Sequence, residues 1–209
     1  MKLSLPERLY VNGFIRNLVQ RPLEFHSFNR IAPFPRHARV LEIGCGNGGN
    51  LAFVSHHYQP QSLTGIDVDP AQVAVARRTL RNAQSVNLST ASADALPFAA
   101  NSFDVILCIG VLHHMPQWPL AVAECARLLR HGGLLYGEEF FPPLLNLSLV
   151  RKLAPHPQTK LSQAALAEAL ARNGFTVLGT SPKPTGIISR WVHRYLAITV
   201  SRLGKAQAA

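Results

Sequence analysis

Four glycines and a carboxylate stand close together near residue 45. A short apolar run that contains Glu42 is followed by four glycines, Gly44, Gly46, Gly48 and Gly49. Glycine tolerates positive φ and lets the backbone approach a ligand closely. The first N–H groups of a helix that opens at such a turn favour a negative group. The stretch therefore predicts a strand, a tight turn and a helix start that bind a ligand carrying a carboxylate or a phosphate.

Two binding motifs overlap in this stretch. Gly44, Gly46 and Gly49 fit G-x-G-x-x-G, the dinucleotide fingerprint. Glu42, Gly44, Gly46 and Gly48 fit a second pattern, E-x-G-x-G-x-G. A glycine-rich turn without any ligand is a third interpretation, so the rest of the chain must decide among them.

Two further acids help to separate these interpretations. Asp67 follows Gly44 by about 20 residues, the spacing expected of an acid that binds ribose hydroxyls. Glu42 places a carboxylate beside the loop, which disfavours a diphosphate and suits a ligand with an ammonium group. Asp94 can accept a hydrogen bond from an adenine amino group. Together the acids favour a positively charged nucleoside.

These residues need a scaffold that brings them together. Strands are predicted at residues 40–43, 63–67, 86–91, 103–109, 134–138, 175–179 and 195–202, and helices at 5–20, 48–57, 71–83, 118–130 and 162–173. This alternation predicts an α/β fold, with a doubly wound, mainly parallel, seven-stranded Rossmann-like sheet and helices on both faces. Ligands of such sheets bind at the carboxyl ends of the strands, where Glu42, Asp67, Asp94 and Ile109 fall.

Length and composition limit the class of protein. The 209 residues are 47% hydrophobic and 15% charged, which excludes a disordered chain. We expect a single domain with an N-terminal helical cap (1–38), a cofactor-binding core (39–140), an apolar lid insertion (141–160) and a C-terminal part of the sheet (161–203). Without a membrane-spanning run or a signal peptide, the expected location is the cytoplasm.

Cysteine usage points away from a disulfide framework or a metal site. The three cysteines, Cys45, Cys108 and Cys125, are scattered and lack the spacing of zinc ligands. We interpret them as small buried apolar residues and expect no metal.

The positive charge lies in the flanks. Residues 1–39 hold seven basic and two acidic residues, and residues 151–209 hold nine and one, whereas residues 40–150 hold five and eight. The basic flanks fit an anionic substrate, a membrane surface or nucleic acid, or simply a basic surface. The segment 5–20 reads as a basic amphipathic helix that covers the pocket or contacts a membrane peripherally. We do not expect nucleic acid as the partner.

Residues 40–140 resemble the Rossmann-like core of the class I S-adenosylmethionine-dependent methyltransferases, of the type that acts on small molecules. Five segments carry the resemblance: 40–46, 65–67, 94–105, 111–115 and 128–133. The resemblance implies that S-adenosyl-L-methionine is the cofactor. Its methionine part would contact Glu42, Gly44, Cys45, Gly46 and Gly48. Its nucleoside would contact Asp67 at the ribose, Val68, Asp94 and Ala95 at the adenine, and Ile109.

Methyl transfer requires a general base only where the acceptor is protonated. His113 and His114 follow the fourth predicted strand and are the candidate bases, with Glu138 and Glu139 as further candidates. Residues 109–112 lack the Asn/Asp-Pro-Pro-Tyr/Phe signature of many base and glutamine N-methyltransferases. We therefore expect a small hydrophobic acceptor that is lipid-, quinone- or aromatic-like. An NAD(P)-dependent short dehydrogenase and a non-catalytic nucleotide- or RNA-associated module remain as alternatives.

Overall fold

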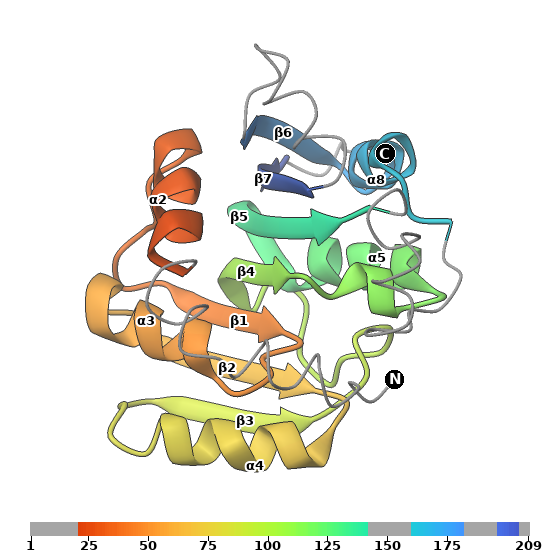
Figure 1. Cartoon of the computed structure of the whole chain (residues 1–209). Helices are drawn as coiled ribbons and strands as arrows, with labels where there is room; N and C mark the ends of the chain where they lie inside the picture. The colour runs from red at the N-terminus through yellow and green to blue at the C-terminus, as the bar shows by residue number, and fades with distance from the viewer. Residues whose placement is uncertain (1–20, 142–159, 182–195, 205–209) are drawn as a thin grey trace.

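One twisted sheet runs through the molecule, with helices against both of its faces (Figure 1). The computed structural model describes residues 21–141, 160–181 and 196–204. The strands are β1 (Arg39–Ile43), β2 (Ser62–Asp67), β3 (Val86–Thr90), β4 (Phe103–Ile109), β5 (Leu129–Phe140), β6 (Phe175–Ser181) and β7 (Leu196–Leu203). The helices are α2 (Arg21–Ile31), α3 (Gly49–Tyr58), α4 (Pro70–Thr79), η2 (Leu112–His114), α5 (Trp118–Leu128) and α8 (Gln163–Arg172).

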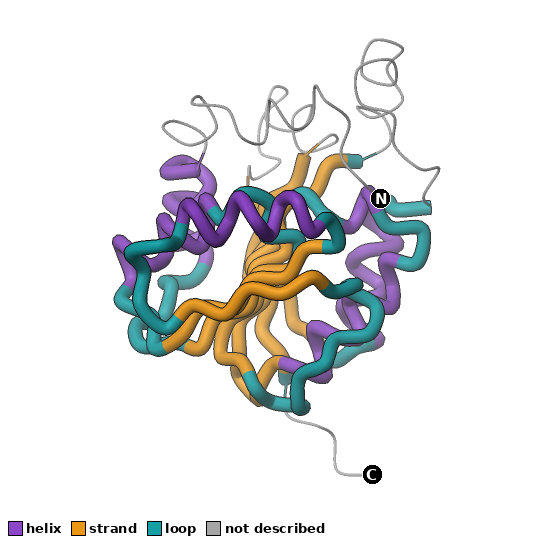
Figure 2. The backbone as a smooth tube through the Cα atoms, turned by 90° about the horizontal axis from the view of Figure 1, so that it is seen from below, coloured by secondary structure: helices purple, strands orange, loops and turns teal. Residues whose placement is uncertain are grey.

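The strand order is β3-β2-β1-β4-β5-β7-β6. Strands β1 to β5 pair in parallel, and β7 runs antiparallel to both β5 and β6. Figure 2 shows the strands as a central layer with helices on either side. The predicted seven-stranded, mainly parallel α/β sheet is thereby confirmed.

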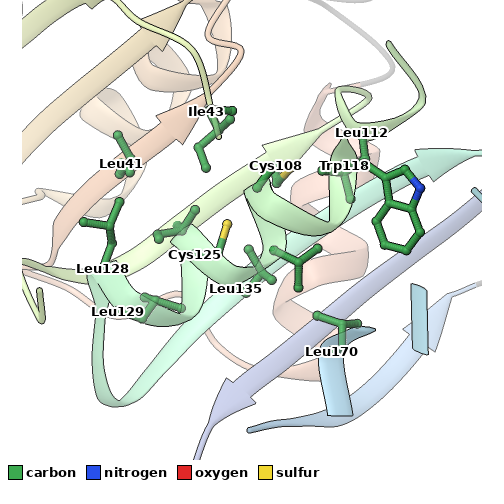
Figure 3. Packing of buried hydrophobic residues seen from close by; sticks show 14 of the residues in the cluster. Leu41, Ile43, Cys108, Leu112, Trp118, Cys125, Leu128, Leu129, Leu135 and Leu170 are labelled. Atoms are coloured by element: carbon green, nitrogen blue, oxygen red, sulfur yellow. The ribbon is translucent and has the colours of Figure 1, made fainter. Parts of the chain in front are cut away.

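Two apolar clusters fill the two sides of the sheet. One packs α5 and α8 against the strands, and Figure 3 shows it around Cys108, Trp118, Cys125 and Leu170. The other packs α2, α3 and α4 against the opposite face. The central strand β4 has neighbours on both faces, which is why its sequence is almost continuously apolar.

Two side chains cap helices at their first turns. The Asp69 Oδ1 accepts a hydrogen bond from the N–H of Ala71 at 3.0 Å and caps α4. The Ser162 Oγ accepts one from Ala165 at 3.2 Å and caps α8. Each side chain satisfies an N–H that the first helical turn leaves without an intrahelical partner.

Helix α2 was not among the predicted helices, since the N-terminal helix was expected to end at residue 20. Pro22 is the second residue of the helix, where a missing N–H removes no intrahelical bond. Phe25 and Phe28 are fully buried, and the Phe28 ring meets Tyr136 edge-on with centroids 5.3 Å apart. The Tyr136 hydroxyl donates to the Pro33 carbonyl at 3.1 Å, so aromatic packing and a hydrogen bond fix α2 on the sheet.

The boundary between α5 and β5 was also predicted wrongly. The helix ends at Leu128 and the strand begins at Leu129, whereas the prediction placed the helix end at Arg130 and the strand start at Leu134. Leu129 is fully buried and pairs with Phe103, so burial favours the strand at this residue. Helix α4 likewise ends at Thr79, earlier than predicted.

Two predictions concern segments outside the described residues. They are the helix at 5–20 and most of the apolar insertion at 141–160. Within the ranges that the structure describes, no helix combines the length and apolar character needed to cross a bilayer.

Candidate functional site

The carboxyl ends of three neighbouring strands form one edge of the site. In the register of the sheet, Ile43 of β1 lies beside Ile66 of β2 and Cys108 of β4. Because the three strands are parallel, Glu42, Asp67 and Ile109 all lie at the same edge. The parallel sheet therefore brings these three residues together, as the sequence predicted.

The loop after β1 has the backbone conformation that its glycines permit. Gly44, Gly46 and Gly48 have φ values of 69°, 51° and 76°, in the left-handed region that side chains with a Cβ rarely occupy. The Cys45 N–H donates to the Ile66 carbonyl at 2.8 Å, which ties the loop to the end of β2. Gly48 then leads into α3, so the first turn of that helix faces the same edge.

Cys45 is placed in the loop but is unsuited to act as a nucleophile. Its side chain is buried, and burial raises the pKa of the thiol, with the charges of Glu42 and Asp67 raising it further. A neutral thiol is a weak nucleophile. Two carboxylates beside the loop, Glu42 and Asp67, make it a poor site for a diphosphate.

Glu42 is buried and takes part in a polar chain. It is 2% exposed, and its Oε1 accepts a hydrogen bond from the Asn50 Nδ2 at 2.7 Å. The Asn50 Oδ1 in turn accepts one from the Arg21 Nε at 2.6 Å. Sequence reasoning did not find Asn50 or Arg21. A position in the first turn of the helix after the glycines was the available signal for Asn50, and no pattern marked Arg21.

Asp67 presents its carboxylate between two backbone segments. Its Oδ2 accepts from the Gly46 N–H at 2.9 Å and its Oδ1 accepts from the Asp69 N–H at 2.8 Å. Burial raises the pKa of Asp67, and these two hydrogen bonds act in the opposite direction. The neighbouring Val68 side chain is 50% exposed, an apolar surface beside the acid that could hold a flat ring.

Asp94 lies in the turn that follows β3, and its side chain is exposed, as is that of Ala95. Among the described residues, no hydrogen bond joins this carboxylate to Glu42 or Asp67. The turn is instead fixed from α5, because the Leu96 N–H donates to the Glu124 Oε2 at 2.8 Å. Hydrogen bonding from Arg127 lowers the pKa of Glu124, which keeps this acceptor charged.

The loop after β4 is held by Glu139. Its carboxylate accepts from the backbone N–H groups of Val111, Leu112 and His113 at 2.8, 3.1 and 2.8 Å. Its Oε2 also lies 3.1 Å from the Nδ1 of His113, so we assign the imidazole proton to Nδ1. Glu139 was a minor candidate in the sequence, and the structure shows that it positions the whole loop.

The two predicted bases differ in their surroundings. His113 is 4% exposed, whereas His114 is half-buried, and their ring centroids are 4.1 Å apart. An added Cβ at Gly44 would overlap the Val111 side chain. The histidine loop therefore packs directly on the glycine loop.

Residues 41–137 match the model of a family described as a methyltransferase domain. This domain belongs to the class I S-adenosylmethionine-dependent methyltransferases. The fold agrees, since a solved S-adenosylmethionine-dependent methyltransferase from Mesorhizobium loti superposes with a TM-score of 0.68 at 16% identity, covering 86% of this chain and 97% of that one. The domain match does not support the dehydrogenase alternative.

Two curated mycobacterial proteins are similar in sequence. The phthiotriol/phenolphthiotriol dimycocerosates methyltransferase 1 of Mycobacterium ulcerans is 32% identical over 142 residues, which cover 66% of this chain and 52% of that protein. The fatty-acid O-methyltransferase of Mycolicibacterium smegmatis is 32% identical over 128 residues, covering 61% and 46%. The chain thus spans about half the length of these relatives.

The residues present fit S-adenosylmethionine, the cofactor of this family. That molecule carries an ammonium group, ribose hydroxyls and a sulfonium, and it has no diphosphate. A buried carboxylate at Glu42 and a half-buried one at Asp67, both beside the glycine loop, suit those groups.

Proposed function

We propose that this chain transfers a methyl group from S-adenosylmethionine to a small hydrophobic acceptor of lipid-like character. The observation that carries the proposal is the attachment of both Glu42 and Asp67 to one glycine loop. Asp67 accepts from Gly46 within the loop, and Glu42 accepts from Asn50 in the helix that the loop opens.

We assign the cofactor contacts from this arrangement together with the resemblance to the family. Glu42 takes the ammonium group, and the loop backbone at Gly44, Cys45, Gly46 and Gly48 lies along the methionine part. Asp67 accepts from the ribose hydroxyls.

A second group of residues is assigned to the adenine end of the nucleoside. Val68 and Ile109 give apolar contact to the nucleoside, while Asp94 and the Ala95 backbone meet the adenine edge. The exposure of Val68, Asp94 and Ala95 supports this assignment because these groups are open to a ligand.

When bound, the sulfonium supplies an electrophilic methyl group without the help of a metal. The protein then contributes mainly by holding the acceptor in line with that group. Where the acceptor is a hydroxyl, the Nε2 of His113 takes its proton, since Nδ1 is directed at Glu139. A carboxylate acceptor is already ionised at neutral pH and needs no base. His114 is the second candidate for the base.

The acceptor class rests on two lines of support. The names of the two mycobacterial relatives state a phthiotriol dimycocerosate and a fatty acid as their substrates. The sequence after β4, residues 109–112, lacks the signature of enzymes that methylate a planar amino group. The relatives' names favour a lipid-like acceptor, and the fatty-acid enzyme's name favours an oxygen atom. The missing signature argues against a planar amino group.

The proposal is tested first by binding and then by turnover. Calorimetric titration with S-adenosylhomocysteine should show one site in the wild-type protein and no binding in a folded Asp67→Ala variant. Methyl-labelled cofactor should then label fatty acids or hydroxylated lipids, and thin-layer separation identifies the product. Binding of NADH without binding of S-adenosylhomocysteine would overturn the proposal.

A further inference from the structure

One cation reaches the cofactor loop from outside the matched domain. Arg21 is the first residue of α2, a segment that precedes the methyltransferase match at residues 41–137. Its side chain is 5% exposed, which is rare for arginine and implies specific partners. It lies at the first turn of α3, where the glycine loop ends.

The partners of Arg21 form a directed chain. The Arg21 Nε donates to the Asn50 Oδ1 at 2.6 Å, and the Asn50 Nδ2 donates to the Glu42 Oε1 at 2.7 Å. With its oxygen facing the arginine and its amino group facing the glutamate, the Asn50 amide has one orientation. All three side chains are more than nine-tenths buried, so the chain is protected from competing water.

Gly49 provides the space for this contact. A Cβ built on Gly49 would lie 2.7 Å from the Arg21 Cζ and closer still to one of its Nη atoms. Gly49 has no left-handed φ that would require glycine. Its lack of a side chain is therefore explained by the approach of the guanidinium. The E-x-G-x-G-x-G motif does not include this glycine.

We propose that Arg21 is a positioning residue for the amino-acid end of the cofactor. By orienting Asn50 it fixes the Glu42 carboxylate that receives the ammonium group, and its charge offsets that of Glu42 in a buried setting. The guanidinium and the first N–H groups of α3 also make this end favourable for the cofactor carboxylate. The inference rests on the proposed function and assigns a segment outside the matched domain to the same site.

Two ligands separate this role from a general role in stability. S-adenosylhomocysteine has the amino-acid part, whereas 5′-methylthioadenosine has the same nucleoside and thioether without it. Arg21→Met should lower the affinity for S-adenosylhomocysteine at least about tenfold, or about 1.4 kcal/mol. Its affinity for 5′-methylthioadenosine should stay within about twofold of the wild-type value. Arg21→Lys, which keeps the charge and one donor nitrogen, should recover part of the loss.

Two variants serve as controls, and a third provides an independent test. Arg30→Met removes the same charge from an exposed position on the same helix and should change neither affinity. Asp67→Ala removes the proposed ribose contact, which both ligands share, so it should lower the affinity for both. Gly49→Ala leaves the arginine in place but displaces its guanidinium, so it should reproduce the selective loss even if Arg21→Met does not fold.

The outcomes are distinct. Selective loss of S-adenosylhomocysteine in Arg21→Met or Gly49→Ala supports the inference. Equal loss of both ligands, or no loss, overturns it while leaving the proposed function intact. Failure of the wild-type protein to bind either ligand overturns both.

Discussion

The Asp67 carboxylate accepts a hydrogen bond from the Gly46 backbone at 2.9 Å, so the acid that ends β2 and the loop that follows β1 hold one another in place. The second oxygen accepts from Asp69 at 2.8 Å. A carboxylate that is held on both oxygens is already oriented before a ligand arrives. Preorganisation of this kind lowers the entropic cost of binding.

Removal of this carboxylate should abolish cofactor binding. Asp67→Ala deletes the acceptor for two backbone N–H groups and the proposed ribose contact, so we expect affinity for S-adenosylhomocysteine to fall at least about 100-fold. Asp69→Ala is the matched control, since it removes an N-cap and should cost about 1 kcal/mol of stability with a much smaller effect on affinity. Calorimetry and thermal unfolding measure the two effects, and equal losses of affinity in both variants would contradict the assignment.

The raised pKa of Asp67 predicts how binding depends on pH. Burial is the main cause of the increase, so the carboxyl begins to take up a proton at a higher pH than an ordinary aspartate, whose pKa is about 4. Cofactor affinity should therefore fall on acidification, starting above that value, because only the ionised form accepts from two ribose hydroxyls. Titrations at a series of pH values test this, and Asp67→Asn should remove that component of the dependence.

Protonation of Asp67 should change the stability of the ligand-free protein in the opposite direction to the cofactor affinity. A carboxyl whose pKa is raised on folding stabilises the fold below its unfolded pKa, and that contribution is lost as the pH rises through the folded value. Denaturant unfolding of wild-type and Asp67→Asn protein over the same pH range should show this trend in the wild type alone.

Asp104 should produce an acid-sensitive contribution of the other sign. Burial opposes its ionisation, but hydrogen bonds from Arg39 and the charges of Arg39 and Arg130 prevail and lower its pKa. Its stabilisation is present above about pH 4 and lost as the pH falls through the lowered pKa. Asp104→Asn should cost about 1 to 2 kcal/mol at neutral pH, allowing for solvent screening of the partly exposed arginines. The loss should shrink in acid, and a cost independent of pH would be inconsistent with this account.

Glu139 should be important for stability as well as for chemistry. Glu139→Gln replaces with an amide the carboxylate that accepts hydrogen bonds from three backbone N–H groups. We therefore expect the free energy of unfolding to fall by about 2 to 3 kcal/mol. Glu168→Gln, on the exposed face of α8, should stay within about 0.5 kcal/mol of the wild type. Chemical denaturation of both variants makes the comparison, and similar values would show that the loop is held by other contacts.

His113 should matter most where the acceptor must lose a proton. His113→Gln should slow methylation of a hydroxylated lipid by about 100-fold or more while leaving cofactor affinity unchanged. A free fatty acid, which is ionised at neutral pH, should be affected far less. If His114→Gln gives this selective loss and His113→Gln does not, the base is His114.

The sheet was predictable because its residues obey the rules on which sequence reading depends. β4 is apolar throughout since it is covered on both faces, and Asp69 and Ser162 mark helix starts through their own hydrogen bonds. Helix α2 was missed for the opposite reason. It buries the charged residues Arg21 and Glu24 beside its aromatic side chains, whereas pattern reading assigns charge to the solvent side.

Part of the candidate site could likewise be predicted from the sequence, and part could not. Glu42 and Asp67 could be placed because the strands that carry them are neighbours and parallel. The link from Arg21 to Asn50 spans 29 positions and pairs polar groups with no periodicity, so the sequence holds no signal for it. Glu139 directly followed a predicted strand, but its hydrogen bonds to the loop after β4 depend on a contact between separate segments.

The antiparallel position of β7 has a consequence for synthesis. In the described sheet β6 pairs with β7 alone, and β7 lies between β5 and β6 although it follows both in the chain. During synthesis, the strand edges of β5 and β6 that pair with β7 stay unpaired until residues 196–203 have left the ribosome. Open strand edges invite association between molecules. A premature stop before residue 196 should therefore yield insoluble protein, even though every proposed cofactor contact would already have been translated.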